Sequence, residues 1–130
     1  HEHQNLAATF LLGGASKALN NLQDFRVDAS YYWHNEFGGT VQFFDTWGSN
    51  DALLYADNAA FKPDSSGVTF QIDGTVFGRD MDTLGGRFNL RIGLQYTVYT
   101  KFDGASTNYD GLGRNAANNN TLRLCVWTAL

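Results

Sequence analysis

The chain has 130 residues, of which 43% are hydrophobic and 17% are charged, and its formal net charge is -4. No run of about eighteen apolar residues occurs, which excludes a helical membrane span. The acidic balance argues against a nucleic-acid surface, which would need clustered Lys and Arg. A single cysteine, Cys125, excludes an intrachain disulfide and a zinc cluster. The length predicts one domain at most, or one portion of a larger one.

The first residues predict little regular structure. The chain opens at His1 with neither an initiator Met nor a charged-then-apolar leader, so we expect either a removed signal peptide or a piece of a longer protein. Segment 6–16 is the first predicted strand, although its apolar residues occur on both faces and Gly13-Gly14 lowers its strand propensity. An intermediate connection over 17–24 is expected to follow.

Strict alternation of apolar and polar residues then predicts five further strands. The longest alternation starts at Phe88 and continues for fifteen residues, whereas a soluble strand usually has about five or six. A tilted membrane strand needs roughly nine to eleven residues and can project beyond the bilayer. Phe44 departs from the alternation of its segment. The five strands are predicted at 25–34, 37–47, 67–78, 87–102 and 121–130.

The lengths of the connections alternate. Residues 34–36 and 79–86 are short connections, whereas 48–66 and 103–120 are long. Transmembrane β-barrels have short periplasmic turns, longer extracellular loops and a periplasmic C-terminus. The pattern therefore predicts an all-β fold, an antiparallel meander of about six strands that is a portion or a subunit of a transmembrane β-barrel.

The two faces of the predicted sheet carry different side chains. The polar face has charges of mixed sign and is expected to line the lumen, either as structural ties between strands or, alternatively, as a selectivity lining. Aromatic residues toward the strand ends are expected at the membrane interface. The lumen-facing residues are Arg26, Asp28, Asp73, Arg91, Lys101 and Arg123, and the interface aromatics are Tyr31, Trp33, Trp47, Tyr96 and Trp127.

Alternation alone leaves a second fold of the same class open. A soluble, secreted small β-barrel also has one apolar and one polar face, with the apolar face turned inward. Such a barrel would hold an apolar ligand. The residues that would hold it are Phe70, Ile72, Leu90, Ile92 and Leu94.

A family resemblance rests on segments 94–104, 108–111, 113–116 and 119–122, together with 31–34, 38–40, 44–48 and 54–55. These segments resemble the C-terminal part of a poorly characterised family of proteobacterial exported outer-membrane β-barrel proteins, sometimes labelled cytochrome-associated. The resemblance covers residues 30–130 and implies a portion of a longer outer-membrane protein, with a periplasmic cytochrome as a partner. It implies no catalytic residues, and the chain has no Cys-x-x-Cys-His haem motif. Outer-membrane barrels typically end in Phe, whereas the last residue here is Leu130.

Two groups of residues could bind metal. His1 and His3, with the free amine, could form an amino-terminal copper site of a periplasmic module, or His1 could act together with His34. The acidic residues of the loops 48–66 and 103–120 lack the spacing of a calcium loop and are interpreted as turn formers.

The prediction for function is therefore a β-barrel component of the outer membrane of a Gram-negative bacterium, acting as a pore, a conduit scaffold or a structural membrane protein. We expect no enzymatic activity, no cofactor and no nucleic acid partner. The expected partners are outer-membrane lipid and either the remaining barrel strands or further copies of the chain, because open sheet edges do not occur in hydrocarbon.

Overall fold

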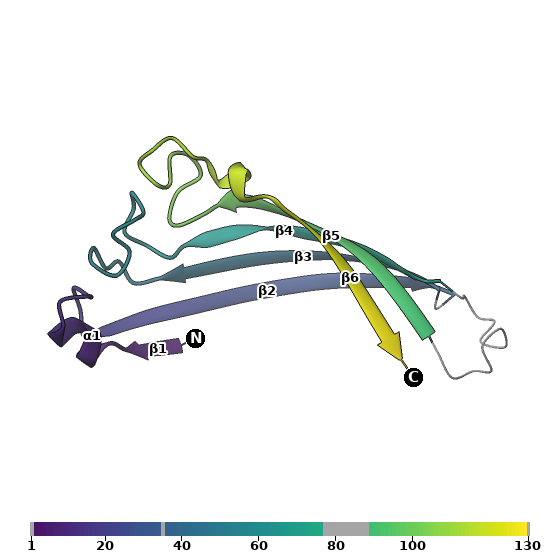
Figure 1. Ribbon diagram of the computed structural model, residues 1–130, viewed down its shortest axis with the longest axis horizontal. Coiled ribbons are helices and arrows are strands. Elements are labelled where there is room, and N and C mark those ends of the chain that lie inside the picture. The colour runs from purple at the N-terminus through teal and green to yellow at the C-terminus, as the bar shows by residue number, and fades with distance from the viewer. Residues whose placement is uncertain (1, 35, 77–88, 130) are drawn as a thin grey trace. The chain divides into compact units, whose positions relative to one another are not determined.

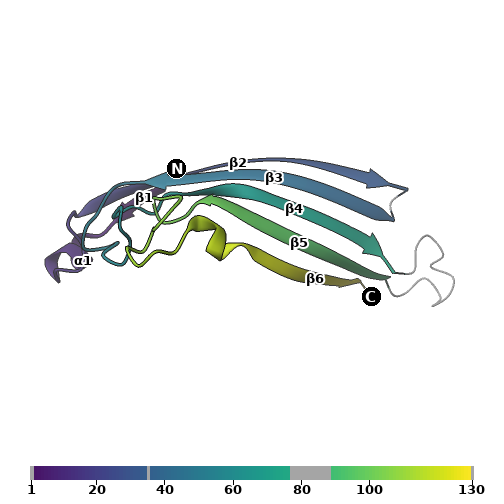
Figure 2. The same ribbon diagram turned by 90° about the horizontal axis from the view of Figure 1, so that it is seen from above.

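The structure is a computed structural model that describes residues 2–34, 36–76 and 89–129. The described residues form one antiparallel sheet in which six strands follow one another in chain order (Figure 1). Seen from above, β2 to β6 lie side by side in the same order (Figure 2). The predicted all-β antiparallel meander is therefore confirmed.

The strand bounds agree with the alternation over most of the chain. Residues 77, 78, 87, 88 and 130, which were also predicted to be in strands, lie outside the described residues. The strands are β1 Glu2–Asn5, β2 Leu19–Trp33, β3 Phe37–Gly48, β4 Ser65–Thr75, β5 Asn89–Lys101 and β6 Thr121–Ala129.

The predicted strand over 6–16 is wrong. Residues Ala7–Leu11 form a short helix, α1, and Gly13 follows it at a φ of +74°, a backbone conformation that glycine adopts without strain. A segment without alternation gives a strand no consistent buried face, so nothing favours the extended form here.

The predicted connection over 17–24 is also wrong, because β2 begins at Leu19. The four residues of β1 pair with this early part of β2, from Glu2 opposite Leu22 to Asn5 opposite Leu19. Three amide side chains in this part of β2 hide the alternation that marks the rest of the strand. They are Asn20, Asn21 and Gln23.

Three of the predicted connections are confirmed in length, whereas the short connection predicted over 79–86 lies outside the described residues. Only 34–36 separates β2 from β3, whereas 6–18, 49–64 and 102–120 are long. The connection between β4 and β5 lies largely outside the described residues. The last long connection contains a 3-10 helix, η2 Ala116–Asn119. None of the described helices is long and apolar enough to cross a membrane.

The described residues divide into two compact units that share the long strands. Unit 1 comprises the residues up to Val27, Phe43–Val68 and Val98–Asn120, and it therefore contains the three long connections. Unit 2 comprises Asp28–Gln42, Thr69–Thr97 and the residues from Thr121. The buried hydrophobic residues among those described all lie in connections of unit 1, and they are Ala15, Tyr109 and Ala116.

Candidate functional site

The sheet of unit 2 has two unlike faces, which β4 displays most clearly. Thr69 and Asp73 are each 7% exposed, whereas Phe70 is 47% and Ile72 is 65% exposed. Polar side chains on this strand are thus more buried than apolar ones. The side with the exposed apolar residues is called the apolar face below, and its large aliphatic members on the other strands of unit 2 are Val41, Ile92, Leu94, Leu122, Leu124 and Val126.

Hydrogen bonds between neighbouring strands connect the residues of the opposite side, the polar face. The hydroxyl oxygens of Thr69 and Thr97 are 3.0 Å apart, and Gln95 Nε2 donates to Gln71 Oε1 at 3.3 Å. Ser30 and Thr40 form a similar hydroxyl pair at 2.8 Å. Such pairs satisfy polar groups that are partly removed from water.

An ion pair lies at the centre of the polar face. Arg91 on β5 donates through Nε and Nη2 to Oδ2 of Asp73 on β4, and Gln71 donates to Oδ1 of the same carboxylate at 3.3 Å. The Arg91 guanidinium also lies 5.1 Å from the centre of the Tyr32 ring on β2, a cation–π distance. One side chain thereby links three strands of the sheet.

Glycines make room for these long side chains. A Cβ at Gly38 on β3 would lie 2.6 Å from Tyr32 Cε1 and 2.8 Å from Arg91 Nη2. A Cβ at Gly93 on β5 would lie 2.9 Å from Trp127 Cζ3 and 3.0 Å from Asp73 Cβ. Both glycines are buried. Glycine is therefore required at each of these positions by the close approach of neighbouring side chains.

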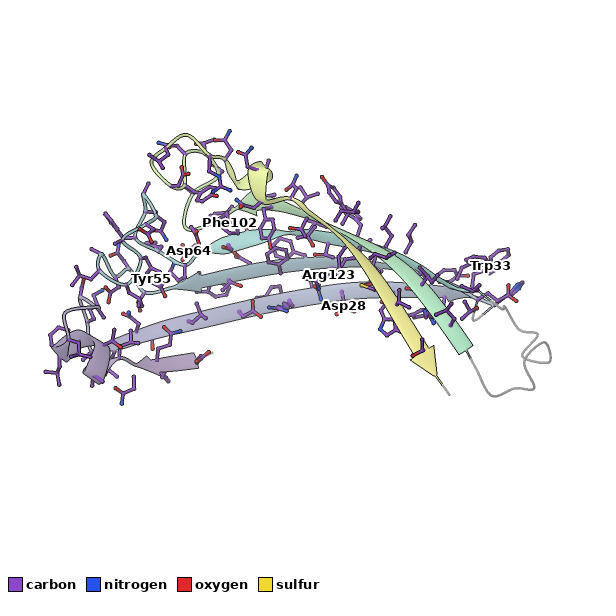
Figure 3. All side chains as sticks on the ribbon, viewed as in Figure 1. Asp28, Trp33, Tyr55, Asp64, Phe102 and Arg123 are labelled. Carbon is purple, nitrogen blue, oxygen red and sulfur yellow. The ribbon has the colours of Figure 1, made fainter. Side chains whose placement is uncertain are left out.

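The structure brings together two of the six polar residues that were predicted to line a lumen, Asp73 and Arg91. Arg26 instead pairs with Asp24 at 2.7 Å in unit 1, and both side chains are largely exposed. Lys101 is half-buried. Asp28 on β2 and Arg123 on β6 are exposed (Figure 3).

The predicted interface aromatics are all substantially exposed. Tyr31 and Trp33 lie at the end of β2, where Trp33 stacks on His34 with ring centres 4.7 Å apart and on Phe37 at 6.4 Å (Figure 3). Trp127 differs from the others because its ring lies over Gly93 on the polar face. The remaining two are Trp47 and Tyr96.

A buried carboxylate organises the long connections of unit 1. The side chain of Asp51 is completely buried and accepts five N–H donors, which tie the connection 49–64 to the segment before β2. The distances lie between 2.7 and 3.2 Å. The donors are the backbone amides of Ser16, Lys17, Leu53 and Leu54 and Nδ2 of Asn20.

The environment of Asp51 favours its charged form. Burial by itself raises the pKa of a carboxyl group. The donors from Leu54, Ser16 and Asn20 outweigh this effect, so the pKa of Asp51 lies well below its usual range. Asp64 and Asp110 also accept hydrogen bonds from backbone amides. Loop aspartates thus stabilise turns and loops, in agreement with their interpretation from the sequence.

Aromatic rings join the end of β5 to its following connection. Tyr99 packs edge-on against Phe44 with ring centres 5.6 Å apart and against Phe102 at 5.2 Å. Phe102 packs against Tyr109 at 5.1 Å. The Phe44 ring covers Gly67, where a Cβ would lie 2.9 Å from Phe44 Cζ. Phe44 thus departs from the sequence alternation because it begins this cluster.

The described part of the chain includes only some of the residues considered for metal binding. His1 lies outside the described residues, and His3 Nδ1 is 2.6 Å from Asn21 Oδ1. Within 2–34, 36–76 and 89–129, no group of three or more His, Cys, Asp or Glu side chains could hold a metal ion. The copper site therefore stays a prediction.

The apolar face carries an open depression of about 440 Å³. Three of the residues considered for an apolar ligand, Ile72, Ile92 and Leu94, line it together with Phe37 and Leu124.

Sequence reasoning missed the buried glycines, the role of Phe44 and the carboxylate of Asp51. One signal was available for the first group, because Gly38, Gly67 and Gly93 each occupy a polar-face position in a strand. The five donors of Asp51 come from residues 31 to 35 positions before it and from its own turn, and no sequence pattern joins them.

No protein-family model, curated protein or solved structure matches this chain. The family resemblance of residues 30–130 therefore stays a prediction.

Proposed function

We propose that this chain is a membrane-embedded β-sheet, a portion or a subunit of a transmembrane β-barrel in the outer membrane of a Gram-negative bacterium. The observation that carries the proposal is the burial along β4, where Thr69 and Asp73 are buried while Phe70 and Ile72 are exposed. Water disfavours such an apolar face by roughly 25 cal/mol for each Å² exposed. Lipid removes this cost, and a barrel in lipid has its apolar residues outside.

The lengths of the apolar stretches support this proposal. On β2 the exposed apolar residues extend from Phe25 to Trp33, and on β4 they are Phe70 and Ile72, with Val68 before them and Val76 directly after the strand. Eight residue steps span roughly 26 Å along a strand, or about 20 Å in height at a typical barrel tilt. The apolar band of known barrels is about 25 Å tall.

The polar face has the properties of a barrel interior. The side chains of Asp73, Arg91 and Gln71 form hydrogen bonds with one another. Hydrocarbon or an apolar core offers no partners for the remaining polar atoms of these side chains, whereas a water-filled barrel interior does. We therefore propose a pore, a conduit scaffold or a structural membrane protein rather than an enzyme.

Partner strands are part of the proposal. In the described sheet β1 and β6 are the edges. Unpaired backbone groups at an edge cost several kcal/mol each in hydrocarbon, so an embedded sheet needs further strands. Outer-membrane lipid and either remaining barrel strands or further copies of the chain are thus the proposed partners. The proposal of a periplasmic cytochrome as a partner rests on the family resemblance alone.

Extraction and gel mobility test this proposal. The chain should require detergent for solubility, associate with lipid vesicles and change its gel mobility between unheated and boiled samples. A folded monomer in plain buffer would contradict a membrane location. It would favour instead a soluble barrel that binds an apolar ligand, for which the depression beside Ile72, Ile92 and Leu94 is the supporting observation. Binding of a fluorescent fatty acid to that soluble monomer would then test the second function.

A further inference from the structure

The sheet of unit 2 has two edges that no described residue pairs with. Strands β2 to β6 each contribute residues to this unit in chain order, so 28–33 of β2 lies at one edge and β6 at the other (Figure 2). The short strand β1 pairs only with 19–22 of β2, which belong to unit 1. Each edge of unit 2 therefore presents a row of unpaired backbone N–H and C=O groups.

The directions of the two edges decide which strands can join them. Neighbouring strands of the sheet are antiparallel, so β2, β4 and β6 run one way and β3 and β5 run the other. Copies of the chain in one membrane would share one orientation, because their long connections would lie on the same side. A β6 edge that met the β2 edge of such a copy would form a parallel pair. Transmembrane barrels are instead built from antiparallel strands.

Strand β1 of a neighbouring copy has the required direction but is too short. It is antiparallel to β2 and has four residues, whereas β6 has nine. The backbone groups of β6 that it left uncovered would stay without hydrogen bonds in hydrocarbon, which membrane proteins avoid. A suitable partner strand has roughly nine to eleven residues, the length of a membrane strand. An odd number of added strands between β6 and β2 keeps every pair antiparallel.

The apolar residues of β6 indicate the alternation of this partner. Leu122, Leu124 and Val126 lie on the apolar face and are 64%, 67% and 57% exposed. Ile92 and Leu94 on the same face of β5, which has a strand on each side, are only 40% and 42% exposed. A partner strand with apolar residues at alternate positions would flank the β6 residues on their open side and extend the apolar face.

The polar face of β6 carries a charge at the same edge. Arg123 lies opposite Gln95 of β5, and its exposed guanidinium has no ion-pair partner among residues 2–34, 36–76 and 89–129. Arg91, within the sheet, pairs with Asp73 of its neighbouring strand. An acidic residue on the partner strand would complement Arg123 in the same way.

We propose that the β6 edge pairs with an antiparallel strand of different sequence, which alternates apolar and polar residues and places an acidic residue beside Arg123. The inference rests on the proposed function, since it is hydrocarbon that requires the edge to be paired. It selects added strands, rather than further copies of this chain, as the partner that covers β6.

A peptide with one cysteine tests this pairing, because Cys125 lies on β6 opposite Gly93. The probe is a peptide of about eleven residues in which Leu and Thr alternate. Cysteine replaces a central Thr, and Asp replaces the Thr two residues after it, so that an antiparallel pair brings the Asp beside Arg123 when the two cysteines are opposite. Added while the wild-type protein folds into vesicles, the peptide should raise the heat-shifted fraction at least about twofold, because it pairs the edge. Oxidation should then join it to Cys125 by a disulfide.

Matched controls separate strand pairing from adhesion to the membrane. A peptide with its cysteine moved by one residue presents the thiol on the opposite face, and it should cross-link at least about fivefold less. Lys in place of the Asp should lower cross-linking to the wild-type protein by about two- to fivefold and should raise it in Arg123→Glu. Cys125→Ala supplies the background. Equal cross-linking by the original and the shifted peptide would overturn the proposal.

The two proposals fail differently. A wild-type chain that neither associates with vesicles nor changes gel mobility on heating contradicts the membrane function. An inserted wild-type chain that captures none of the peptides contradicts only the pairing of β6. An inserted chain that instead forms Cys125–Cys125 dimers on oxidation contradicts it as well, because a second copy would then cover the β6 edge.

Discussion

Both compact units bury polar side chains, but among the described residues only unit 1 also buries hydrophobic ones. Unit 1 places Tyr109 and Ala116 inside its folded connections and surrounds the Asp51 carboxylate with donors. Unit 2 buries Thr69 and Asp73 and exposes its large apolar residues. Both units also expose large apolar residues, such as Leu19 and Phe25 in unit 1, so buried apolar residues rather than exposed ones distinguish unit 1. The exposed apolar residues of unit 2 support the proposed lipid environment.

The strongest way to disturb unit 1 alone is Asp51→Asn. The asparagine removes the charge and turns an amide N–H₂ toward the donors of Oδ2, which leaves the Lys17 backbone amide and Asn20 Nδ2 without an acceptor. We expect the loss of loop structure, seen as at least about tenfold faster amide exchange in 6–18 and 49–64. Exchange in the strands of unit 2 should stay unchanged. Equal acceleration in both units would contradict their separate stabilisation.

Acid should act on the same site. The pKa of Asp51 is depressed in the folded chain, so its contribution to stability is present above the unfolded pKa of about 3.9 and declines as the pH falls below it toward the folded value. Loop exchange rates should therefore be flat from pH 7 to about pH 4 apart from intrinsic chemistry and should rise below that range. In Asp51→Asn the additional rise should be absent.

The membrane character of unit 2 is tested by a matched pair on β5. Leu94→Arg places a charge on the apolar face, which costs roughly 2–4 kcal/mol near the bilayer centre. Gln95→Arg places the same charge on the polar face and should be tolerated. The measurement is the fraction of heat-shifted protein after folding into vesicles. If water covered the apolar face, Leu94→Arg would fold as well as Gln95→Arg.

A smaller effect is expected from crowding on the polar face. Gly38→Ala places a methyl group against Tyr32 and Arg91 and should destabilise the folded chain by about 1–3 kcal/mol. Gly39→Ala meets no atom within 4 Å and should be neutral or slightly stabilising. Urea titrations monitored by tryptophan fluorescence compare the two. Similar unfolding midpoints would show that the Tyr32 and Arg91 side chains move away from the added methyl group without loss of stability.

The smallest effect should come from one hydroxyl pair. Thr97→Val removes the partner of the Thr69 hydroxyl, which is part of a buried side chain, and should cost about 1 kcal/mol in the same urea titration. Thr107→Val, in an exposed part of the connection 102–120, is the control. A midpoint unchanged by Thr97→Val would mean that another group or water replaces the bond.

Much of the fold was predictable from period-two alternation, because one register gives each strand two consistent faces. This held for 25–33, 37–47, 67–75, 89–101 and 121–129. It failed where side chains on both faces are polar, as at Asn20 and Asn21, and where a short helix replaces a strand at Ala7–Leu11.

The candidate site was predictable only in part. The alternation identified Asp73 and Arg91 as polar-face residues. It did not predict that they pair, because the sequence of a single strand does not determine its register with the neighbouring strand. The hydrogen bonds to the Asp51 carboxylate join segments that are far apart in the sequence. Arg26 pairs with Asp24, two residues before it on the same strand. The membrane location, the interface aromatics and the copper site stay predictions.

Three glycines on the polar side each lie beneath a neighbouring ring: Gly38 beneath Tyr32, Gly67 beneath Phe44 and Gly93 beneath Trp127. This arrangement selects one strand alignment during assembly. A shift of two residues preserves which face is polar, so the Thr and Gln pairs alone would accept it. The same shift would place each ring against a residue that has a side chain, and the two would clash. The ring and glycine pairs therefore disfavour a misaligned sheet whose polar and apolar faces would still be correct.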